Sequence, residues 1–297
     1  MQTPDLSVVV PAYNEKDAIV PTIESILLVF ESSDVNVEII VVNDGSKDGT
    51  GDRLRSFIAG SSRAAERVRL IEHERNRGYG ASLKTGIRSA AASLIAITDA
   101  DGTYPNERLP EMLAKLRAED FDMVVGRRPF KKLPLLTKPA KWAITSLANF
   151  LTGENIKDIN SGLRIFRKEI AERFFGIISD GFSFTTTITL SMMTNGYRVH
   201  YFDIDYLKRE GKSKIRPIKD TLNFIQLIIR TVMYFDPLKV FVPLSLLLFI
   251  AGAALLFGGM LFGKMYDISF VILSAGAFQM LGIGMLADLI VKTKKGI

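Results

Sequence analysis

The stretch from Ala96 to Pro105 carries the residues whose types and spacing point most directly to chemistry. The apolar run Ser93 to Thr98 predicts a buried strand, and two carboxylates, Asp99 and Asp101, follow its end. In an open parallel sheet, ligands bind outside the carboxyl ends of the strands. Two acidic groups so close together repel one another unless a cation shares them. Since Mg²⁺ and Mn²⁺ bind through one or two carboxylates plus substrate phosphates, the pair predicts a divalent metal that holds a diphosphate. A solvated turn after a strand is the alternative interpretation.

The elements that must position these carboxylates alternate along the chain. Apolar runs predict strands at Leu6–Pro11, Val37–Val42, Val68–Glu72, Ser93–Thr98, Asp122–Gly126 and Val199–Ile204. Helical spacing of apolar residues predicts helices at Ala18–Phe30, Thr50–Ala59, Ser82–Ala92, Glu107–Ala118, Leu133–Leu151, Phe184–Asn195 and Ile218–Tyr234. Because the strands are apolar throughout rather than alternating, they predict an α/β fold with a parallel sheet covered on both faces.

Composition narrows the chemistry. The 297 residues include no cysteine and only two histidines, His73 and His200, which excludes disulfides, thiolate chemistry and a histidine-rich metal site. The net charge of +6 would allow nucleic acid, anionic lipid or a phosphorylated substrate as a partner. Since no nucleic-acid motif occurs and the aromatic residues lie mostly in apolar runs, we expect no nucleic-acid partner.

The end of the chain is far more apolar than the rest. Val240–Phe262 has no charged residue and Ile268–Ile290 has only Asp288, so each could cross a bilayer, which takes about 20 apolar residues. The short linker between them predicts a transmembrane hairpin; two buried core helices are the alternative. The linker carries only Lys264, whereas the outer ends carry Arg230, Lys239, Lys292, Lys294 and Lys295. The positive-inside rule therefore places the N-terminal domain in the cytoplasm.

Three regions follow from this organisation. We expect residues 1–215 to form the cytoplasmic α/β domain, with an amphipathic helix at 133–151. Residues 216–236 are expected to form an amphipathic helix in the membrane interface, and residues 237–297 the hairpin. The polar N-terminal residues predict no signal peptide. Glycines in both spans would allow close helix packing and a homo-oligomer: Gly252, Gly258, Gly259, Gly276, Gly282 and Gly284.

Further segments offer groups that bind phosphate or a nucleoside. Asp44 directly follows a predicted strand, where its carboxylate could accept a hydrogen bond from a base or a ribose. The loop Asn76–Gly80 opens a helix, whose unpaired backbone N–H groups favour an anion. This loop is neither G-x-G-x-x-G nor a Walker A sequence, which argues against hydride transfer and ATP hydrolysis. Basic side chains from three segments between the carboxylates and the membrane helices would bind phosphate: Arg127, Arg128, Arg164, Arg209, Lys212 and Lys214.

Four motifs together resemble the family 2 glycosyltransferases with a GT-A fold. They are Val8-Val9-Val10-Pro11-Ala12-Tyr13-Asn14-Glu15, Val41-Val42-Asn43-Asp44-Gly45-Ser46, Asp99-Ala100-Asp101, and the pair Asn160-Ser161-Gly162-Leu163-Arg164-Ile165-Phe166 and Arg209-Glu210-Gly211-Lys212-Ser213-Lys214. The last pair narrows the likeness to the polyprenyl-phosphate sugar transferases. The resemblance covers essentially the whole chain, and it implies a Rossmann-like, mostly parallel catalytic domain with interface helices and a membrane hairpin.

The resemblance also implies roles for individual residues. The nucleotide sugar would be bound by Pro11, Ala12, Tyr13, Glu15, Asp44, Gly80, Lys84, Asp99, Ala100 and Asp101. Mg²⁺ or Mn²⁺ would be bound by Asp99 and Asp101, with Thr103 standing where the dolichyl-phosphate mannose synthases have a glutamine ligand. The acceptor phosphate would be bound by Arg127, Arg128, Lys141, Ser161, Arg164, Arg209 and Lys214. The catalytic set would be Asp101, Asp158, Arg128 and Arg164. The absence of a Q-x-x-R-W motif argues against processive polysaccharide synthesis.

The expected reaction is transfer of one sugar from a nucleotide sugar to polyprenyl phosphate. The acceptor phosphate is anionic near pH 7, so its oxygen can attack the anomeric carbon without a strong base, and a single displacement inverts that carbon. Two alternatives stay open. A lipid hydroxyl such as that of diacylglycerol would need a base, for which Asp158 is the candidate, although Asp158 could instead cap the turn before Asn160. A degenerate domain could serve as a scaffold or a nucleotide-sugar sensor.

Overall fold

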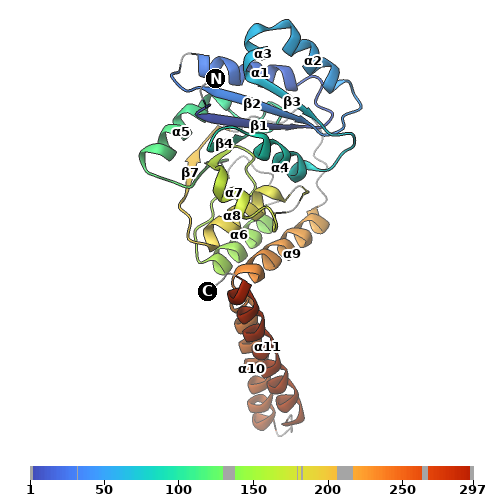
Figure 1. Ribbon diagram of the computed structural model, residues 1–297. Helices are drawn as coiled ribbons and strands as arrows, with labels where there is room; N and C mark the ends of the chain where they lie inside the picture. Colours follow the sequence, from blue (N-terminus) through green and yellow to red (C-terminus); the bar gives the residue numbers. More distant parts are fainter. Residues whose placement is uncertain are drawn as a thin grey trace.

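An α/β unit and a long helical hairpin that projects from it make up the protein (Figure 1). The computed structural model describes residues 3–31, 33–129, 138–178, 180–181, 183–205, 217–262 and 267–294, and at 138–144, 217–224 and 294 the backbone alone. The hairpin leaves the α/β unit beside helix α9 (Pro217–Phe235), and the strands lie at the far end of the molecule (Figure 1).

The described residues form one seven-stranded, mostly parallel sheet, as the apolar runs predict. In space the order is β3-β2-β1-β4-β6-β5-β7. The strands are β1 (Leu6–Ala12), β2 (Val37–Asn43), β3 (Val68–Glu72), β4 (Leu94–Ile97), β5 (Met123–Arg127), β6 (Arg164–Arg167) and β7 (Val199–Asp203). Their bounds agree with the predicted strands within two residues, except that β6 was not predicted as a strand.

Strand β6 runs against its neighbours, and this reversal matters for the site. It pairs antiparallel with both β4 and β5, so that Arg164 lies opposite Ile97 on one side and Val125 on the other. The amino end of β6 therefore lies at the edge where β4 and β5 have their carboxyl ends. The loop before β6, residues 158–163, joins the strand-end loops of the parallel strands for this reason.

Helices cover both faces of the sheet. They are α1 (Ile19–Glu31), α2 (Thr50–Gly60), α3 (Ser62–Arg67), α4 (Tyr79–Ser89), α5 (Leu109–Ala118), α6 (Lys138–Thr152), α7 (Lys168–Arg173), α8 (Phe184–Thr194) and α9. The six-residue α3 and α7 were not predicted because they are too short to show an apolar period. Helix α4 begins three residues before its predicted start, and a 3₁₀ turn, η1 (Asn106–Arg108), precedes α5. The first five residues of the predicted helix 133–151 lie outside the described residues.

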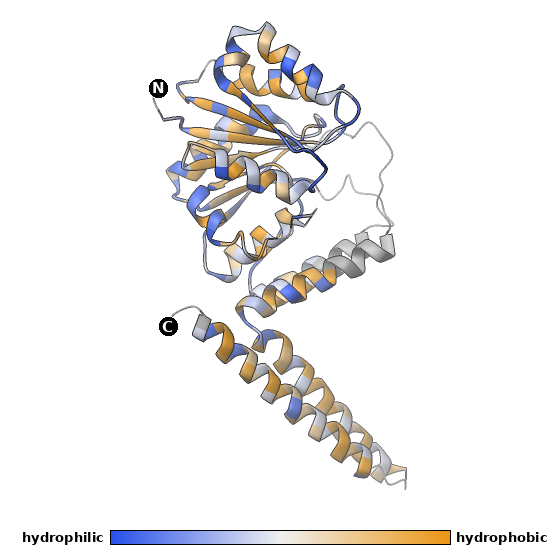
Figure 2. Ribbon diagram, turned by 45° about the vertical axis from the view of Figure 1, so that its right-hand side comes forward, coloured by the Kyte–Doolittle hydropathy of each residue, from blue (hydrophilic) through white to orange (hydrophobic). Residues whose placement is uncertain are grey.

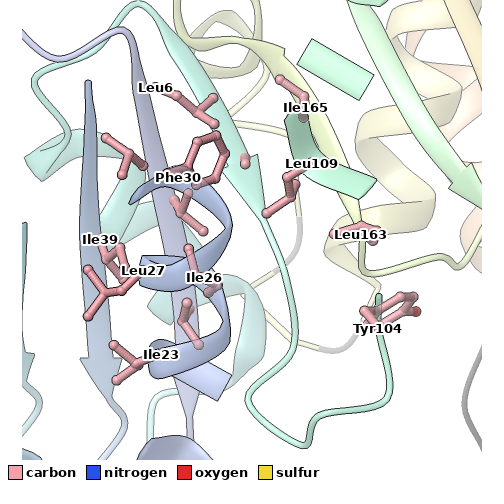
Figure 3. Packing of buried hydrophobic residues seen from close by; sticks show 14 of the residues in the cluster. Leu6, Ile23, Ile26, Leu27, Phe30, Ile39, Tyr104, Leu109, Leu163 and Ile165 are labelled. Atoms are coloured by element: carbon pink, nitrogen blue, oxygen red, sulfur yellow. The ribbon is translucent and has the colours of Figure 1, made fainter. Parts of the chain in front are cut away.

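Two apolar layers hold the helices on the sheet. On one face, Ile23, Ile26, Leu27 and Phe30 of α1 are buried in one cluster with residues of β1 and β2, including Ile39 (Figure 3). On the other face, Val9, Ile40 and Val42 meet Leu83 and Ile87 of α4 and Phe184, Ile188 and Met192 of α8. Burial of each such side chain contributes roughly 1.5–3 kcal/mol, so these layers position the strand ends that carry the motifs.

Helix α8 is buried on all sides and links the sheet to helices α6 and α9. Its Leu190 and Met193 belong to a third apolar cluster with Ala148 and Leu151 of α6 and Ile228 and Val232 of α9. This cluster attaches α6 and α9 to the α/β unit close to the start of the hairpin. The polar residues of α8, which include Thr185, Thr186 and Thr189, are buried as well.

Two of the described helices, α10 (Leu238–Leu261) and α11 (Asp267–Lys294), are long and apolar enough to cross a membrane. Their mean hydropathies are 2.6 and 1.9, and only 6% and 11% of the respective apolar windows are buried. This exposure argues against the alternative of buried core helices, and both helices are apolar along most of their length (Figure 2). A Cβ on Gly284 would lie 2.5 Å from Cβ of Phe241, whereas a Cβ on Gly258 or Gly282 would meet no described atom of another element within 4 Å.

A substitution at Gly86 tests the packing of α4 on the sheet. A Cβ at this position would lie 2.3 Å from Cγ1 of Val9 and 3.3 Å from Cγ2 of Val42. We expect Gly86→Ala to lower the free energy of unfolding by about 1–3 kcal/mol through overpacking, as measured by urea unfolding in detergent. Gly60→Ala is the matched control, since a Cβ there meets nothing within 4 Å. An unchanged midpoint for Gly86→Ala would contradict this packing.

Candidate active site

The motif residues gather at one edge of the sheet. The carboxyl ends of β1, β2, β4 and β5 deliver the loops that begin at Tyr13, Asp44, Thr98 and Arg128, and the reversed β6 brings residues 158–163 to the same edge. Loops from distant parts of the chain thus lie at the same edge of the sheet. This is the place where ligands bind in open parallel sheets.

Backbone-to-side-chain hydrogen bonds join the loops after β1 and β2. The Asn14 amide donates to Oγ of Ser46 at 2.9 Å, and the Lys47 amide donates to Oδ1 of Asn14 at 2.9 Å. The Glu15 amide donates to Oγ1 of Thr50 at 3.1 Å. Of the predicted nucleotide-sugar residues beside these loops, Pro11 and Ala12 are buried and Tyr13 is exposed. The two loops therefore form one rigid rim with the Tyr13 ring on its surface.

Asp44 is buried and accepts several hydrogen bonds. Its carboxylate accepts from the amides of Arg77 and Gly78 at 2.9 and 2.8 Å, and Oδ1 lies 2.6 Å from Nδ1 of His73. The other ring nitrogen of His73 lies 3.0 Å from Oγ1 of Thr85. This network ties the end of β2 to the end of β3 and to the loop before α4, and it holds Asp44 in a single orientation.

The amino end of α4 differs from the prediction. Its N–H groups were expected to receive a phosphate, but the Gly80 amide donates to the Gly181 carbonyl at 3.1 Å and the Ala81 amide to the Asp180 carbonyl at 2.9 Å. Lys84 Nζ donates to the Ile178 carbonyl and to Oδ1 of Asp180 at 2.7 Å. The chain segment around residue 180 therefore occupies this helix end, and Gly80 and Lys84 support that segment in the structure.

Asp99 and Asp101 both lie at the carboxyl end of β4, half-buried. The Tyr79 hydroxyl donates to Oδ1 of Asp99 at 2.9 Å. Burial, and next the charge of Asp99, raise the pKa of Tyr79 well above its ordinary value, so the phenol stays protonated as a donor. The Thr103 hydroxyl donates to Oδ1 of Asp101 at 2.7 Å, which orients that carboxylate. Ala100 between the two is buried, and its carbonyl accepts from Thr22.

The donor set fits a hard cation held partly by substrate. Among the described residues, no group of three His, Cys, Asp or Glu side chains could hold a metal by itself. Mg²⁺ and Mn²⁺ bind through one or two carboxylates and complete their shells with phosphate oxygens and water. The pair Asp99 and Asp101, with the Thr103 hydroxyl beside it, suits this arrangement.

Asp158 is fully buried and paired with Arg128. Oδ2 accepts from Nε of Arg128 at 2.8 Å and Oδ1 from Nη2 at 2.9 Å, which is a bidentate pair. The same carboxylate accepts from the amides of Arg128 and Asn160, both at 3.2 Å. These bonds confirm that Asp158 caps the turn before Asn160, and they fix the Arg128 guanidinium, whose side chain is 21% exposed, at the edge.

Arg164 was expected to face a phosphate, but its side chain has no exposed surface. Its guanidinium donates to the carbonyls of Ser161 and Thr185 and to Oγ1 of Thr189. Burial lowers its pKa from the ordinary value, while nearby tyrosines and Asp158 act in the opposite direction. Ser161 is also buried, and its hydroxyl oxygen has no hydrogen-bond partner among the described residues.

The other predicted phosphate ligands are placed less centrally. Arg127 makes a bidentate ion pair with Asp203 at the end of β7, and both side chains are exposed. Arg209 and Lys214 lie outside the described residues, as does the side chain of Lys141 in α6. The structure therefore brings together Tyr13, Asp44, Asp99, Asp101, Thr103, Arg128, Asp158 and Ser161 of the predicted set.

Comparison with known proteins decides the family. Residues 7–175 match the glycosyl transferase family 2. The chain belongs to this family. It is 31% identical over 216 residues to a dolichyl-phosphate hexose transferase from Haloferax volcanii, covering 72% of this chain and 87% of that protein. It is 30% identical over 218 residues to an undecaprenyl-phosphate mannosyltransferase from Micrococcus luteus, covering 70% and 86%.

A third relative is longer. The glycosyltransferase is 32% identical over 174 residues to a dodecaprenyl-phosphate galacturonate synthase from Rhizobium johnstonii, which covers 58% of this chain and about half, 51%, of that protein. Among solved structures, glucosyl-3-phosphoglycerate synthase from Mycobacterium tuberculosis, with Mn²⁺, UDP-glucose and phosphoglyceric acid, aligns with a TM-score of 0.62. That alignment has 18% identity and covers 77% of this chain and 80% of the other. It supports the GT-A fold.

Two tyrosines of this glycosyltransferase were not assigned a role from the sequence. Tyr79 donates to Asp99, and the Tyr104 hydroxyl accepts from the Gly162 amide at 2.7 Å. Tyr79 is the first residue of α4 and Tyr104 follows the Asp pair, and both lie in segments that the sequence had singled out, Asn76–Gly80 and Ala96–Pro105. Their position in those segments was the available signal, but a buried tyrosine in a strand-end loop is equally typical of a core.

Proposed function

We propose that this glycosyltransferase moves one hexose from a nucleotide sugar to polyprenyl phosphate, with inversion at the anomeric carbon and with Mg²⁺ or Mn²⁺. The names of its relatives support a polyprenyl-phosphate acceptor. The observation that carries the choice of acceptor is the pairing of Asp158 with Arg128. A hydroxyl acceptor needs a general base, and a buried carboxylate held by four hydrogen bonds is poorly suited to take up a proton. A phosphate acceptor needs none.

In this proposal the chain's residues bind and orient rather than exchange protons. Tyr13, Glu15 and Asp44 hold the nucleoside at the rim formed by the loops after β1 and β2. Asp99 and Asp101, supported by Tyr79 and Thr103, would hold the metal, which when bound supplies positive charge beside the diphosphate. Arg128 and Ser161, together with Arg127, Lys141, Arg209 and Lys214, would hold the acceptor phosphate.

The displacement then follows from positioning. An oxygen of the acceptor phosphate forms a bond to the anomeric carbon while the bond from that carbon to the nucleoside diphosphate breaks. The leaving diphosphate takes up the electron pair, and the fixed charge around it lowers the barrier. Ser161 is as buried as Arg164, but its hydroxyl has no partner among the described residues, so a phosphate oxygen that reaches this loop could accept from it.

The proposed location is the cytoplasmic face of a membrane. We propose that α10 and α11 cross the bilayer, that α9 lies in its interface, and that residues 1–215 form the cytoplasmic catalytic domain. The length and hydropathy of the two helices support this arrangement. The attachment of α6 and α9 to α8 would place the catalytic edge close to the lipid headgroups, where a polyprenyl phosphate resides.

A transfer assay on the full purified chain in nanodiscs tests the proposal. The reaction would contain Mn²⁺ or Mg²⁺, a panel of radiolabelled UDP- and GDP-sugars, and undecaprenyl or dolichyl phosphate, with free polyprenol and diacylglycerol in parallel. We expect labelled lipid only with the phosphate acceptors and only with metal. Label on a hydroxyl acceptor would contradict the proposal, and nucleotide binding without any product would favour a sensor.

A further inference from the structure

Resting on the proposed function, we propose that Arg164 is a positioning residue that acts through the Ser161–Gly162 peptide. Arg164 and Tyr104 fix this peptide from its two sides and hold it against Asp99. The loop that carries Ser161 and the carboxylate that would serve the metal are then parts of one rigid unit. In this arrangement Arg164 contacts neither the donor diphosphate nor the acceptor phosphate.

The contacts of Arg164 exclude a direct role at the surface of the site. Its Nε donates to the Ser161 carbonyl at 3.1 Å, and Nη2 donates to the same oxygen. Nη1 donates to the Thr185 carbonyl at 3.1 Å and to Oγ1 of Thr189 at 2.9 Å. Within the described part of the chain, Arg164 forms no ion pair and has no exposed surface. Burying the charged guanidinium of Arg164 among neutral acceptors costs free energy. The charge is nevertheless buried here because it holds the Ser161 carbonyl in place.

The other half of the same peptide is held by Tyr104. The Gly162 amide donates to the Tyr104 hydroxyl at 2.7 Å. The carbonyl and the N–H of one peptide unit are therefore both fixed by buried side chains from outside the loop. A peptide plane held at both ends cannot rotate, so the Ser161 side chain and the Gly162 Cα have set directions.

Gly162 transmits this rigidity to Asp99. A Cβ on Gly162 would lie 2.8 Å from Oδ2 and 2.9 Å from Oδ1 of Asp99, so the backbone lies directly against the carboxylate. The Tyr79 hydroxyl holds Oδ1 at 2.9 Å. The carboxylate thus lies between the loop and Tyr79, and any rotation of the Ser161–Gly162 peptide would move it.

The experiment measures Mn²⁺ binding without turnover. Electron paramagnetic resonance of Mn²⁺ would be titrated on the full chain with UDP, and separately with GDP, in the absence of any lipid acceptor. We expect Arg164→Met, Tyr104→Phe and Gly162→Ala each to weaken Mn²⁺ binding about tenfold, as loss of supporting contacts to metal ligands does. Arg164→Lys should lose less, since it retains the charge and a donor nitrogen. Ser161→Ala should leave Mn²⁺ binding unchanged and raise the KM for polyprenyl phosphate.

The outcomes separate this role from a direct one. If Arg164→Lys and Arg164→Met raise only the KM for polyprenyl phosphate and leave Mn²⁺ binding as in the unmodified chain, Arg164 binds the acceptor and the proposal is overturned. If Arg164→Met does not fold, Gly162→Ala and Tyr104→Phe carry the test, and normal Mn²⁺ binding in both overturns it. Normal Mn²⁺ binding by the unmodified chain with no transfer to any lipid would contradict the proposed function but not the role of Arg164. Failure of the unmodified chain to bind Mn²⁺ with either nucleotide would contradict both the proposed function and the role of Arg164.

Discussion

Replacing Asp101 by asparagine is expected to lower the rate of sugar transfer by about a thousandfold, the upper range for loss of one fixed group that stabilises the transition state. The reason is charge. The amide keeps the size of the carboxylate and can still accept from Thr103, but it cannot hold a divalent cation beside a leaving diphosphate. The measurement is the initial rate of labelled lipid formation at saturating Mn²⁺.

Two comparisons make this result specific. Asp52→Asn serves as the matched control, because its side chain is 81% exposed on α2 and its loss should leave the rate unchanged. Thermal unfolding should show Asp101→Asn folded as the unmodified chain is. A transfer rate within a few-fold of the unmodified chain would show that Asp101 does not serve the metal.

Replacing Arg128 by methionine is expected to lower the free energy of unfolding by about 3–5 kcal/mol, the usual cost of breaking one partner out of a buried ion pair. Asp158 has no exposed side-chain surface, so the substitution removes its bidentate partner and leaves its charge buried. Urea unfolding in detergent measures the change. The exposed pair of Arg127 with Asp203 provides the matched control, and Arg127→Met should change the free energy by about 0–1 kcal/mol.

A double substitution tests the cause. Arg128→Met combined with Asp158→Asn removes both charges. The double variant should therefore lose much less free energy of unfolding than the sum of the losses in the two single variants. Sugar transfer should stay low in Arg128→Met and in the double variant, since the acceptor phosphate loses the Arg128 guanidinium in each. Additive losses would show that the two residues contribute independently and that Asp158 is available for another role.

Much of the fold followed from local patterns in the chain. The apolar runs of β1 to β4 and the helical spacing of α1 and α5 produce their elements because each buries one face or both in the same layers. Strand β6 was not predicted because its four residues begin and end with arginine, a pattern typical of a loop. The short helices α3 and α7 were not predicted because six residues contain too few helical turns to show a period of apolar residues.

The same distinction between local patterns and long-range contacts applies to the site. The sequence by itself determined which groups were available: the Asp99 and Asp101 pair, the carboxylate after β2, the Ser161–Gly162 motif and the apolar hairpin, since residue types and their spacing from strand ends are local properties. Only the tertiary structure decided how those groups are used. It placed Asp158 on Arg128, filled the amino end of α4 with the segment around Asp180, and buried Arg164 beneath the Ser161 carbonyl. These outcomes depend on contacts between segments 20 to 100 residues apart, where the reversal of β6 and the buried α8 determine which donor meets which acceptor.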